Sequence, residues 1–370
     1  MAMTSRERIM RIFRNEETDR PALKLWGAGL DEYMLHPDYR PVWEKALQVT
    51  DLFGGAGSAF DIICGQNGKK YREVWDEPFA PGWILRHVVY HTPKGDLHGA
   101  ERLSTEGEPG YTQEYTIKEP GDIEKILSIP YTPFPFDRSG YDRAEAQMGD
   151  RGVTLFHLDH PGYAAQRLIG SENMAFFSVD EREKLKELIE TLGIRVRNHA
   201  KAALDNGICG GFGWVGPELL IPPLMGYRDF REFVVDVDKP VCDDIKNAGG
   251  HIWVHCHGKV GRLIDDFVEM GVDILNPIEP PPNGDVLLDQ IVKKHGRAIG
   301  WEGNIEIQTL LQGTEELVRE EIRRCAKVGK EVGRFILCPS AGYMEYTHPT
   351  REYLHNLMVY LEYGLECLGG

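Results

Sequence analysis

Short apolar stretches bounded by glycine or polar residues recur along the chain and alternate with segments of helical periodicity. Eight of these stretches have the length and content of β-strands: residues 22–27, 60–65, 153–158, 208–215, 251–257, 273–278, 298–302 and 335–338. Helical spacing of apolar residues is clearest in residues 181–205, 219–248, 261–270, 286–295 and 314–328. Strand followed by helix, repeated in this way, predicts an α/β fold built as one parallel (β/α)₈ barrel, a TIM barrel.

Two segments depart from this repeat. A helical pattern at residues 5–14, starting at Ser5, precedes the first strand and is expected to cap the floor of the barrel. Residues 69–152 contain alternating stretches, such as 84–91 and 111–117, separated by glycine and proline. That pattern indicates antiparallel hairpins. Because no low-complexity linker divides the sequence, we predict a single domain over residues 1–370 with a hairpin-rich insertion at 69–152.

Composition narrows the classes of partner and compartment. The chain has 370 residues, enough for one large barrel, and a formal net charge of -16. This charge argues against a nucleic-acid partner, which requires clustered Lys and Arg. The seven cysteines show no paired spacing, as is typical of a reducing compartment. The first residues lack the apolar core of a secretory signal, and no apolar run is long enough to span a bilayer. We therefore expect a cytoplasmic protein without a membrane partner.

The strongest candidate chemistry lies in the sequence Val254-His255-Cys256-His257-Gly258, at the end of a predicted strand. Side chains on a strand alternate between its faces, so His255 and His257 are expected to point to one side and Cys256 to the other. Active sites of (β/α)₈ barrels lie at the carboxyl ends of the strands. Two imidazoles at such an end can supply part of a zinc coordination shell. The alternative is a pair of hydrogen-bonded histidines without metal.

Other predicted strands also end in reactive or aromatic side chains. Glu279 and Glu302 are read either as functional acids or as ion-paired structural carboxylates, and Cys338 either as a ligand or as a buried small residue. His160, with His157 and Asp159, forms either a catalytic relay or a satisfied polar network. A further set is aromatic and either walls a pocket for a flat substrate or belongs to the core: Trp26, Phe212, Trp214, Trp301 and Tyr343.

A group of motifs spread over nearly the whole chain resembles the uroporphyrinogen decarboxylase superfamily. The motifs are Ser5-Arg6-Glu7-Arg8-Ile9 with Asp19-Arg20-Pro21, Asp61-Ile62, Trp75-Asp76-Glu77, Asp238-Lys239-Pro240 ahead of Gly249-Gly250, His255-x-His257-Gly258, Gly303-Asn304-Ile305 and Cys338-Pro339-Ser340. Within the superfamily the chain looks more like the corrinoid-dependent methyltransferases, of the O-demethylase or methylcobamide type, than like the decarboxylases. Uroporphyrinogen decarboxylases carry arginines near the first strand, where this chain has Trp26-Gly27-Ala28-Gly29.

The resemblance implies zinc bound through a His-x-Cys pair and a second Cys in the turn after the last strand. Here His257 stands where the family commonly has Cys, and Ala341 stands at the position of the distal Cys. The expected ligands are therefore His255, His257 and either Glu302 or Cys338, with a fourth position for substrate or water. Ligation by histidine and carboxylate suits an ether or hydroxyl oxygen better than a thiol.

The resulting hypothesis is an enzyme, a zinc-assisted methyltransferase that moves a methyl group from a small methoxylated aromatic donor to a corrinoid. The corrinoid must come from a partner protein, because the chain lacks an Asp-x-His-x-x-Gly motif. His160, Glu279 or Glu302 would supply general acid chemistry. One alternative is a metal-independent decarboxylase that uses Asp61 and the cluster around His157. Another is a non-catalytic protein that docks a corrinoid protein. The exterior helices would permit a homodimer, and no sequence feature decides its presence.

Overall fold

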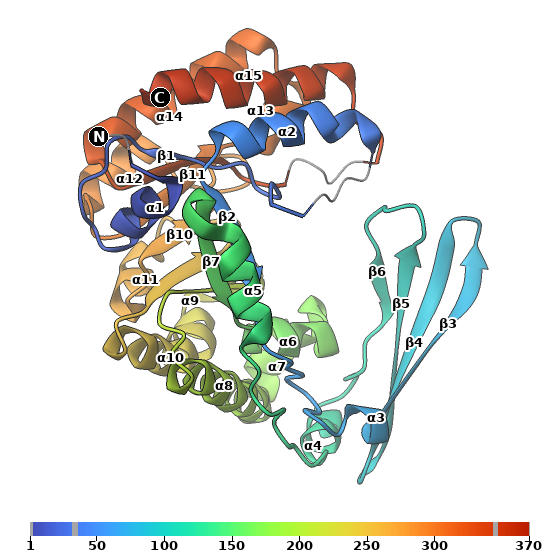
Figure 1. The fold of residues 1–370 in the computed structure, drawn as a ribbon. Helices are drawn as coiled ribbons and strands as arrows, with labels where there is room; N and C mark the ends of the chain where they lie inside the picture. The colour runs from blue at the N-terminus through green and yellow to red at the C-terminus, as the bar shows by residue number, and fades with distance from the viewer. Residues whose placement is uncertain (1–2, 32–35, 343–346, 370) are drawn as a thin grey trace.

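A curled sheet of eight parallel strands forms the centre of the protein. The computed structural model describes residues 3–31, 36–342 and 347–369. Within them the strand order is β1-β12-β11-β10-β9-β8-β7-β2. The strands are β1 (Ala22–Leu23), β2 (Leu52–Ala56), β7 (Gly152–His157), β8 (Gly211–Val215), β9 (His251–His255), β10 (Ile274–Asn276), β11 (Gly300–Ile305) and β12 (Phe335–Pro339). This order follows the sequence around the sheet and confirms the predicted (β/α)₈ barrel (Figure 1).

A buried carboxylate closes the barrel where the first and second strands meet. The backbone N–H of Asp51 donates to the carbonyl of Leu23 over 2.7 Å, and the N–H of Leu23 donates to Oδ2 of Asp51 over 2.9 Å. Asp51 is fully buried and also pairs with Arg8 and, at 3.3 Å, with Arg20. A side chain therefore supplies part of the pairing that a longer first strand would make with its own backbone.

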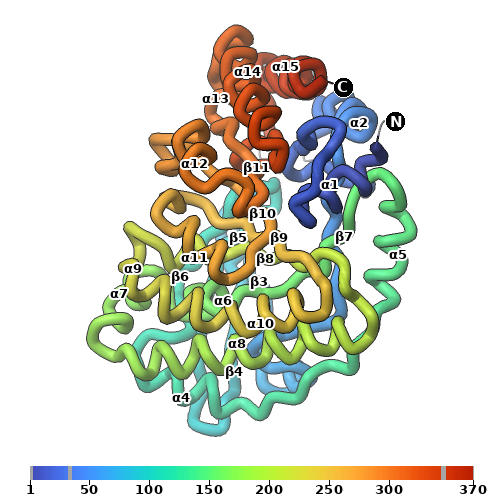
Figure 2. The backbone as a smooth tube through the Cα atoms, turned by 90° about the vertical axis from the view of Figure 1, so that its left-hand side faces the viewer, coloured from blue at the N-terminus to red at the C-terminus, as the bar shows by residue number. Residues whose placement is uncertain are grey.

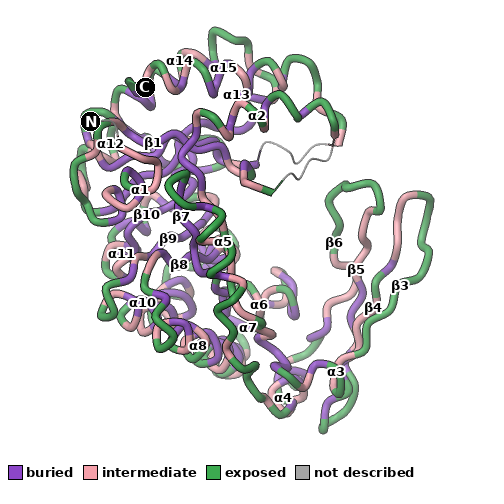
Figure 3. Tube along the Cα trace, viewed as in Figure 1, coloured by how far each residue is buried: buried purple, intermediate pink, exposed green. Residues whose placement is uncertain are grey.

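Helices surround the strands and bury one face each against them, as the purple segments of Figure 3 show. They are α2 (Arg40–Val49), α5 (Ser139–Met148), α6 (Pro161–Ile169), α7 (Ser171–Asp180), α8 (Arg182–Asp205), α10 (Asp236–Asn247), α11 (Ile264–Met270), α12 (Leu288–His295), α13 (Ile307–Gln312), α14 (Glu315–Val332) and α15 (Arg351–Leu368). Helix α14 illustrates the logic: Thr314 caps its first turn, and Val318, Ile322, Cys325 and Gly329 repeat on its buried side. No described helix combines the length and apolar character needed to cross a membrane.

The second strand lies earlier than the sequence pattern predicted. Residues 60–65 form a turn in which Oδ1 of Asp61 accepts hydrogen bonds from the N–H groups of Ile63 and Cys64, at 3.0 Å each. The second strand of the barrel is β2 instead. Its Gly54 and Gly55 are poor strand residues, so the local sequence does not indicate a strand there. A Cβ at position 54 would meet the terminal methyl of Met148 of α5 at 2.8 Å, so a larger residue there would have to displace that side chain.

The predicted continuous helix at residues 219–248 is also wrong. The segment is broken into a short 3₁₀ turn η3 (Pro217–Leu220), α9 (Tyr227–Phe230), a π-helical turn η4 (Arg231–Val235) and α10. Pro222 and Pro223 lie in the first break. Proline has no N–H for the helical ladder and its ring clashes with the preceding turn, so no helix runs through this point.

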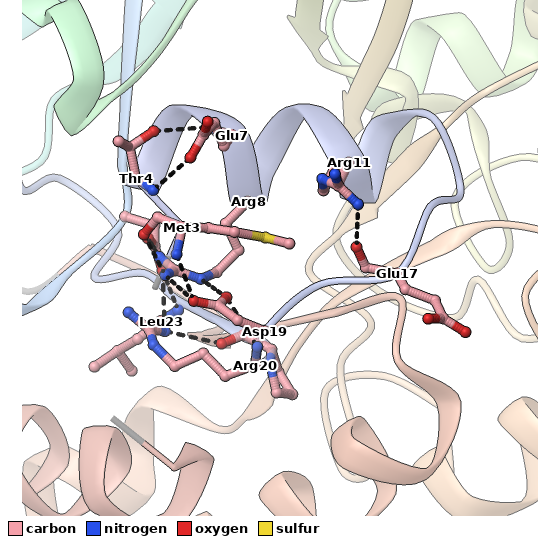
Figure 4. Close-up of polar contacts among 11 residues, drawn as sticks. Met3, Thr4, Glu7, Arg8, Arg11, Glu17, Asp19, Arg20 and Leu23 are labelled. Atoms are coloured by element: carbon pink, nitrogen blue, oxygen red, sulfur yellow. Dashed lines mark hydrogen bonds and ion pairs between the residues drawn. The ribbon is translucent and has the colours of Figure 1, made fainter. Parts of the chain in front are cut away.

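The predicted floor helix is confirmed as α1 (Ser5–Phe13). A capping box between Thr4 and Glu7 starts it, and Arg8 anchors it to Asp19 at 2.8 Å (Figure 4). Its apolar side enters the cluster formed at the amino ends of the strands, where the Phe13 ring stacks on His251 with centroids 5.4 Å apart. From the other end of the chain, Arg334 donates to the carbonyl oxygens of residues 12 and 13, over 2.8 and 3.0 Å.

The predicted hairpins are confirmed as an antiparallel sheet, called the arm below. It consists of β3 (Arg72–Ala80), β4 (Trp83–Thr92), β5 (Gly95–Ser104) and β6 (Tyr111–Glu114), with α3 (Gly68–Tyr71) before it and α4 (Gly121–Leu127) after it. The arm stands to one side of the barrel in Figure 1. In Figure 2, which is turned by 90°, it lies behind the barrel strands. Two ion pairs tie it to the barrel: Arg72 with Asp61 at 2.9 Å, and Glu101 with Arg167 at 2.7 Å. Asp61 follows β2 and Arg167 follows β7, so the arm is attached at the carboxyl ends of the strands.

Candidate active site

An apolar pocket of about 440 Å³ opens at the carboxyl ends of the first strands. Its walls are aromatic and aliphatic side chains together with glycine backbone, and its polar groups are few. The lining residues are Lys24, Leu25, Trp26, Gly27, Ala28, Gly29, Phe53, Gly54, Gly55, Leu155, His157, Gly213, Val215 and Trp253. A pocket of this size and character is typical of a small-molecule site.

A buried ion pair lies at this pocket. Nζ of Lys24 lies 2.5 Å from Oε1 of Glu302, and both side chains are almost fully buried. The same carboxylate accepts a hydrogen bond from Nδ2 of Asn276 on Oε1 and one from Nε1 of Trp253 on Oε2, each over 2.7 Å. Three donors therefore hold Glu302 as an ionised, oriented acceptor.

Three aromatic rings surround the ammonium group of this pair. Nζ of Lys24 lies 4.7 Å from the centroid of Trp26, 4.2 Å from that of Phe53 and 4.7 Å from that of Trp253. Such contacts stabilise a desolvated cation by about 0.5 to 2 kcal/mol each. The rings and Glu302 together fix the position of Lys24 and neutralise its charge at the pocket wall.

His255 is a neutral imidazole whose tautomer follows from its neighbour. Because Nδ2 of Asn276 donates to Glu302, its Oδ1 is the atom that faces Nδ1 of His255, at 2.5 Å. An amide oxygen only accepts, so Nδ1 carries the proton and Nε2 holds the lone pair. The ring stacks on Trp26 with centroids 4.8 Å apart. Burial, and secondarily the nearby His257, lowers the pKa of His255 to about 3.

The predicted alternation of the two histidines is confirmed. The rings of His255 and His257 lie with centroids 4.5 Å apart, whereas Cys256 is fully buried in the outer core. Nδ1 of His257 lies 3.0 Å from Oε1 of Glu279, and Oε2 of Glu279 accepts the N–H of Gly258 over 2.7 Å. Glu279 therefore holds both the imidazole and the backbone of this strand end.

The histidine pair fits two positions of a metal shell, because in each ring a partner oxygen holds Nδ1 as metal-bound histidines commonly require. Glu302 does not fit as a third ligand, since its oxygens already accept three hydrogen bonds. Cys338 is fully buried, and burial and then Glu302 raise the pKa of its thiol well above the ordinary value. Within the described residues no three His, Cys, Asp or Glu side chains form a metal-holding group. Zinc ligation by this set stays a prediction.

A second hollow of about 510 Å³ adjoins the pocket and shares His157 and Gly55 with it. Burial raises the pKa of Asp159 and lowers that of His199 to about 4. His160 is absent from both linings. Its Nδ1 accepts the N–H of Tyr163 as the cap of α6, and its Nε2 lies 3.1 Å from Asp238. The satisfied-network reading is the one that the contacts of His160 support.

The remaining candidates lie in different places. Trp26 lines the pocket, whereas Phe212, Trp214 and Trp301 point to the outer side of their strands and belong to the core under the helices. Asp61 caps the turn at residues 61–64 and binds Arg72 at the base of the arm. Tyr343 lies outside the described residues.

Sequence reasoning missed Lys24, Trp253 and Asn276 as site residues. Lys24 carried a usable signal: it is a lysine within the apolar run Ala22-Leu23-Lys24-Leu25, in register with Trp26. A charged residue inside a strand that is otherwise buried needs a partner, and the barrel interior is where one is available.

Comparisons with known proteins agree with the barrel. A family model described as uroporphyrinogen decarboxylase (URO-D) matches residues 161–352. Among solved structures, a methyltransferase from Methanosarcina mazei superposes with a TM-score of 0.63 at 14% sequence identity, covering 97% of this chain and 98% of that chain. A similarity at this identity shows a shared fold. No curated protein matches the sequence significantly.

Two further solved structures are only weakly similar. A psychrophilic glycoside hydrolase family 10 endo-β-1,4-xylanase has a TM-score of 0.32 at 9% identity, covering 61% of this chain and 83% of that chain. The muconate lactonizing enzyme from Pseudomonas putida has a TM-score of 0.27 at 10% identity, covering 79% and 77%. Scores of this size carry no argument about either fold or function.

Proposed function

This chain belongs to the uroporphyrinogen decarboxylase family, and we propose that it is a methyltransferase that removes a methyl group from a small methoxylated aromatic compound. The acceptor would be a corrinoid carried by a partner protein. The observation that carries the proposal is the aromatic pocket of about 440 Å³, whose wall residue Trp26 stacks on His255 with ring centroids 4.8 Å apart.

The shape of the pocket supports a flat, single-ring substrate. Trp26 and Trp253 lie nearly parallel, with ring centroids 5.6 Å apart and an interplanar angle of 16°. Their rings, with Phe53 and Leu155, offer stacking surface, and the glycine backbone leaves room for a ring to approach. Burial of aromatic area would supply most of the binding free energy.

The charges at the pocket favour an uncharged ether over a polycarboxylate. Among the described lining residues, Lys24 is the one lysine or arginine, and Glu302 already neutralises it. A substrate with several carboxylates needs free guanidinium or ammonium groups. This contrast supports demethylation over the alternative, a metal-independent decarboxylase.

Cleavage of an aryl methyl ether leaves an oxygen that gains an electron pair and needs a proton or a positive partner. Zinc held by His255 and His257 would supply Lewis-acid stabilisation of that oxygen. Glu279, at 3.0 Å from Nδ1 of His257, would hold this imidazole with its other nitrogen, Nε2, as the zinc ligand. His255 stays neutral because burial lowers its pKa to about 3, so it acts as a lone-pair donor rather than as an acid.

The test is an anaerobic assay with free cob(I)alamin and a panel of methoxylated aromatics, preceded by metal analysis of the purified protein. We expect a phenol to form as cob(I)alamin is consumed, and His255→Ala and His257→Ala to lose at least 100-fold in rate. Cys256→Ala is the matched control, since this side chain lies on the opposite face and should leave the rate within twofold.

Two outcomes would overturn the proposal. Release of carbon dioxide from a carboxylated substrate without corrinoid would indicate the decarboxylase. Capture of a corrinoid protein without methyl transfer from any donor, under reducing conditions, would indicate a docking protein instead.

A further inference from the structure

The second hollow at the barrel mouth holds polar side chains that the proposed demethylation does not use. It measures about 510 Å³ and shares Gly55 and His157 with the aromatic pocket of about 440 Å³. Its polar side chains are Ser58, His157, Asp159 and His199, and its described lining contains no lysine or arginine. Because the hollow is as large as the pocket, a lone aromatic ring in the pocket would leave this whole space to solvent.

Three titratable side chains converge on the hollow. His157 ends β7, Asp159 follows it by two residues, and His199 comes from α8. The ring of Phe60 stacks on His199 with centroids 4.4 Å apart and an interplanar angle of 20°, which orients this imidazole, and burial lowers its pKa to about 4. Across the described part of the chain, none of the three side chains forms a hydrogen bond or an ion pair with another residue. Their partners must therefore be water or a ligand.

The hydrogen-bonding capacities of these groups favour one class of ligand. A neutral imidazole has one donor and one acceptor nitrogen, whereas an ionised carboxylate only accepts. A hydroxyl group can donate to Asp159 and accept from an imidazole N–H at the same time. An ammonium group only donates, so it would leave the imidazole N–H groups unpaired. A carboxylate ligand would face Asp159 with no cation in the described lining to offset the repulsion.

We propose that the hollow binds a hydroxylated substituent of the same molecule whose aromatic ring lies in the pocket. The substrate class is then an aryl methyl ether with a polyol tail, and the hydroxyls of this tail bind Asp159, His157 and His199. His157 lines both spaces, so it marks the junction between ring and tail. This assignment rests on the proposed function, because it requires that the pocket takes the ring.

Isothermal titration calorimetry with two ethers of para-methoxyphenol tests the tail site. The glyceryl ether carries two hydroxyls on its tail, and the propyl ether has the same ring and chain length without them. Cob(I)alamin is left out, so that binding is measured without methyl transfer. We expect the glyceryl ether to bind roughly fivefold more tightly or better, since the propyl chain would leave the polar groups of the hollow unpaired.

Variants separate the tail from the ring. Asp159→Ala and His199→Phe should bring the affinities of the two ethers within twofold of each other and leave that of the propyl ether unchanged. Trp26→Ala should weaken both ethers at least tenfold, because they share the ring site. Asp150→Asn is the matched control: this exposed carboxylate precedes β7 at the opposite end of the strand, so the preference should stay. Circular dichroism verifies the folding of each variant.

Four results would overturn the tail site. Equal affinity of the parent for the two ethers would do so and leave the aromatic pocket in place. Tighter binding of the aminopropyl ether than of the glyceryl ether would indicate a cation site at Asp159 instead. Undiminished binding of the glyceryl ether by Trp26→Ala would mean that the tail binds apart from the ring. If neither ether bound to the parent, the tail site and the proposed function would fail together.

Discussion

Replacement of Lys24 by methionine tests the buried ion pair most directly. The substitution keeps the length of the side chain and removes the ammonium group from a carboxylate that is fully buried. Glu302 would retain the N–H donors of Asn276 and Trp253 and lose its charged partner. Removing one member of a buried pair costs about 3 to 5 kcal/mol, because the remaining charge is uncompensated.

In this variant the carboxylate of Glu302 can avoid the cost of an uncompensated charge by taking up a proton. For an ordinary glutamic acid, protonation at pH 7 costs about 3.7 kcal/mol, from 1.36 kcal/mol for each pH unit above about 4.3. The loss of unfolding free energy in Lys24→Met is therefore expected at about 3.5 kcal/mol at pH 7, and at about 1 kcal/mol at pH 5. For 370 residues, unfolding entropy of about 0.8 kcal/mol per degree converts the loss at pH 7 to roughly 5 °C in Tm.

Urea unfolding at pH 7 and pH 5 measures these values. The double variant Lys24→Met/Glu302→Gln removes both charges and keeps a hydrogen-bonding side chain beside Trp253, so it should recover to within about 1 kcal/mol of the parent. A loss below 1 kcal/mol at pH 7, or an equal loss at both pH values, would refute the reasoning. The pair would then contribute nothing that solvent could not replace.

Three further predictions follow from other residues. Burial lowers the pKa values of His255 and His199 to about 3 and about 4, so both take up protons on unfolding and the unfolding free energy should fall as pH drops below about 6.5. His199→Phe should flatten that decline in pH-dependent calorimetry by close to one proton. Trp26→Ala should weaken binding of a methoxylated aromatic at least tenfold by isothermal calorimetry, whereas Trp301→Phe, under the outer helices, should leave it unchanged. Asp51→Asn should cost about 3 to 5 kcal/mol in urea unfolding, since it leaves two arginines without their buried partner.

The repeat of strands and helices could be predicted because the spacing of apolar residues that marks each element is visible in a single sequence. The misplaced second strand shows the limit of that signal. Gly54 and Gly55 are poor strand residues locally, and β2 exists because it pairs with β7 and packs tightly on Met148. Contacts between segments so distant in sequence leave no local trace.

The aromatic residues show a second limit. A strand buried on both faces does not reveal which face lines the pocket, because both faces are apolar. The sequence left both positions open for all of these aromatic residues; Trp26 lines the pocket, whereas the side chains of Trp214 and Trp301 lie on the opposite face of their strands. One residue whose face is known would settle the orientation of the first strand, and Lys24 is such a residue. Its charge requires the interior partner Glu302, and Trp26, two residues later on the same face, therefore points inward as well.

The anchoring of α1 has a consequence for biosynthesis. Among the described elements this helix leaves the ribosome before the others, yet two of its last carbonyls accept hydrogen bonds from Arg334, 322 residues later than Ile12. At about 5 to 20 residues per second, that delay is roughly 15 to 60 s. During this delay the apolar side chains of Ile9, Ile12 and Phe13 lack part of the cluster that buries them in the folded barrel. An early helix of this barrel is thus among the last to receive its full set of contacts, and nascent chains stalled before residue 334 should be the aggregation-prone species that chaperones meet.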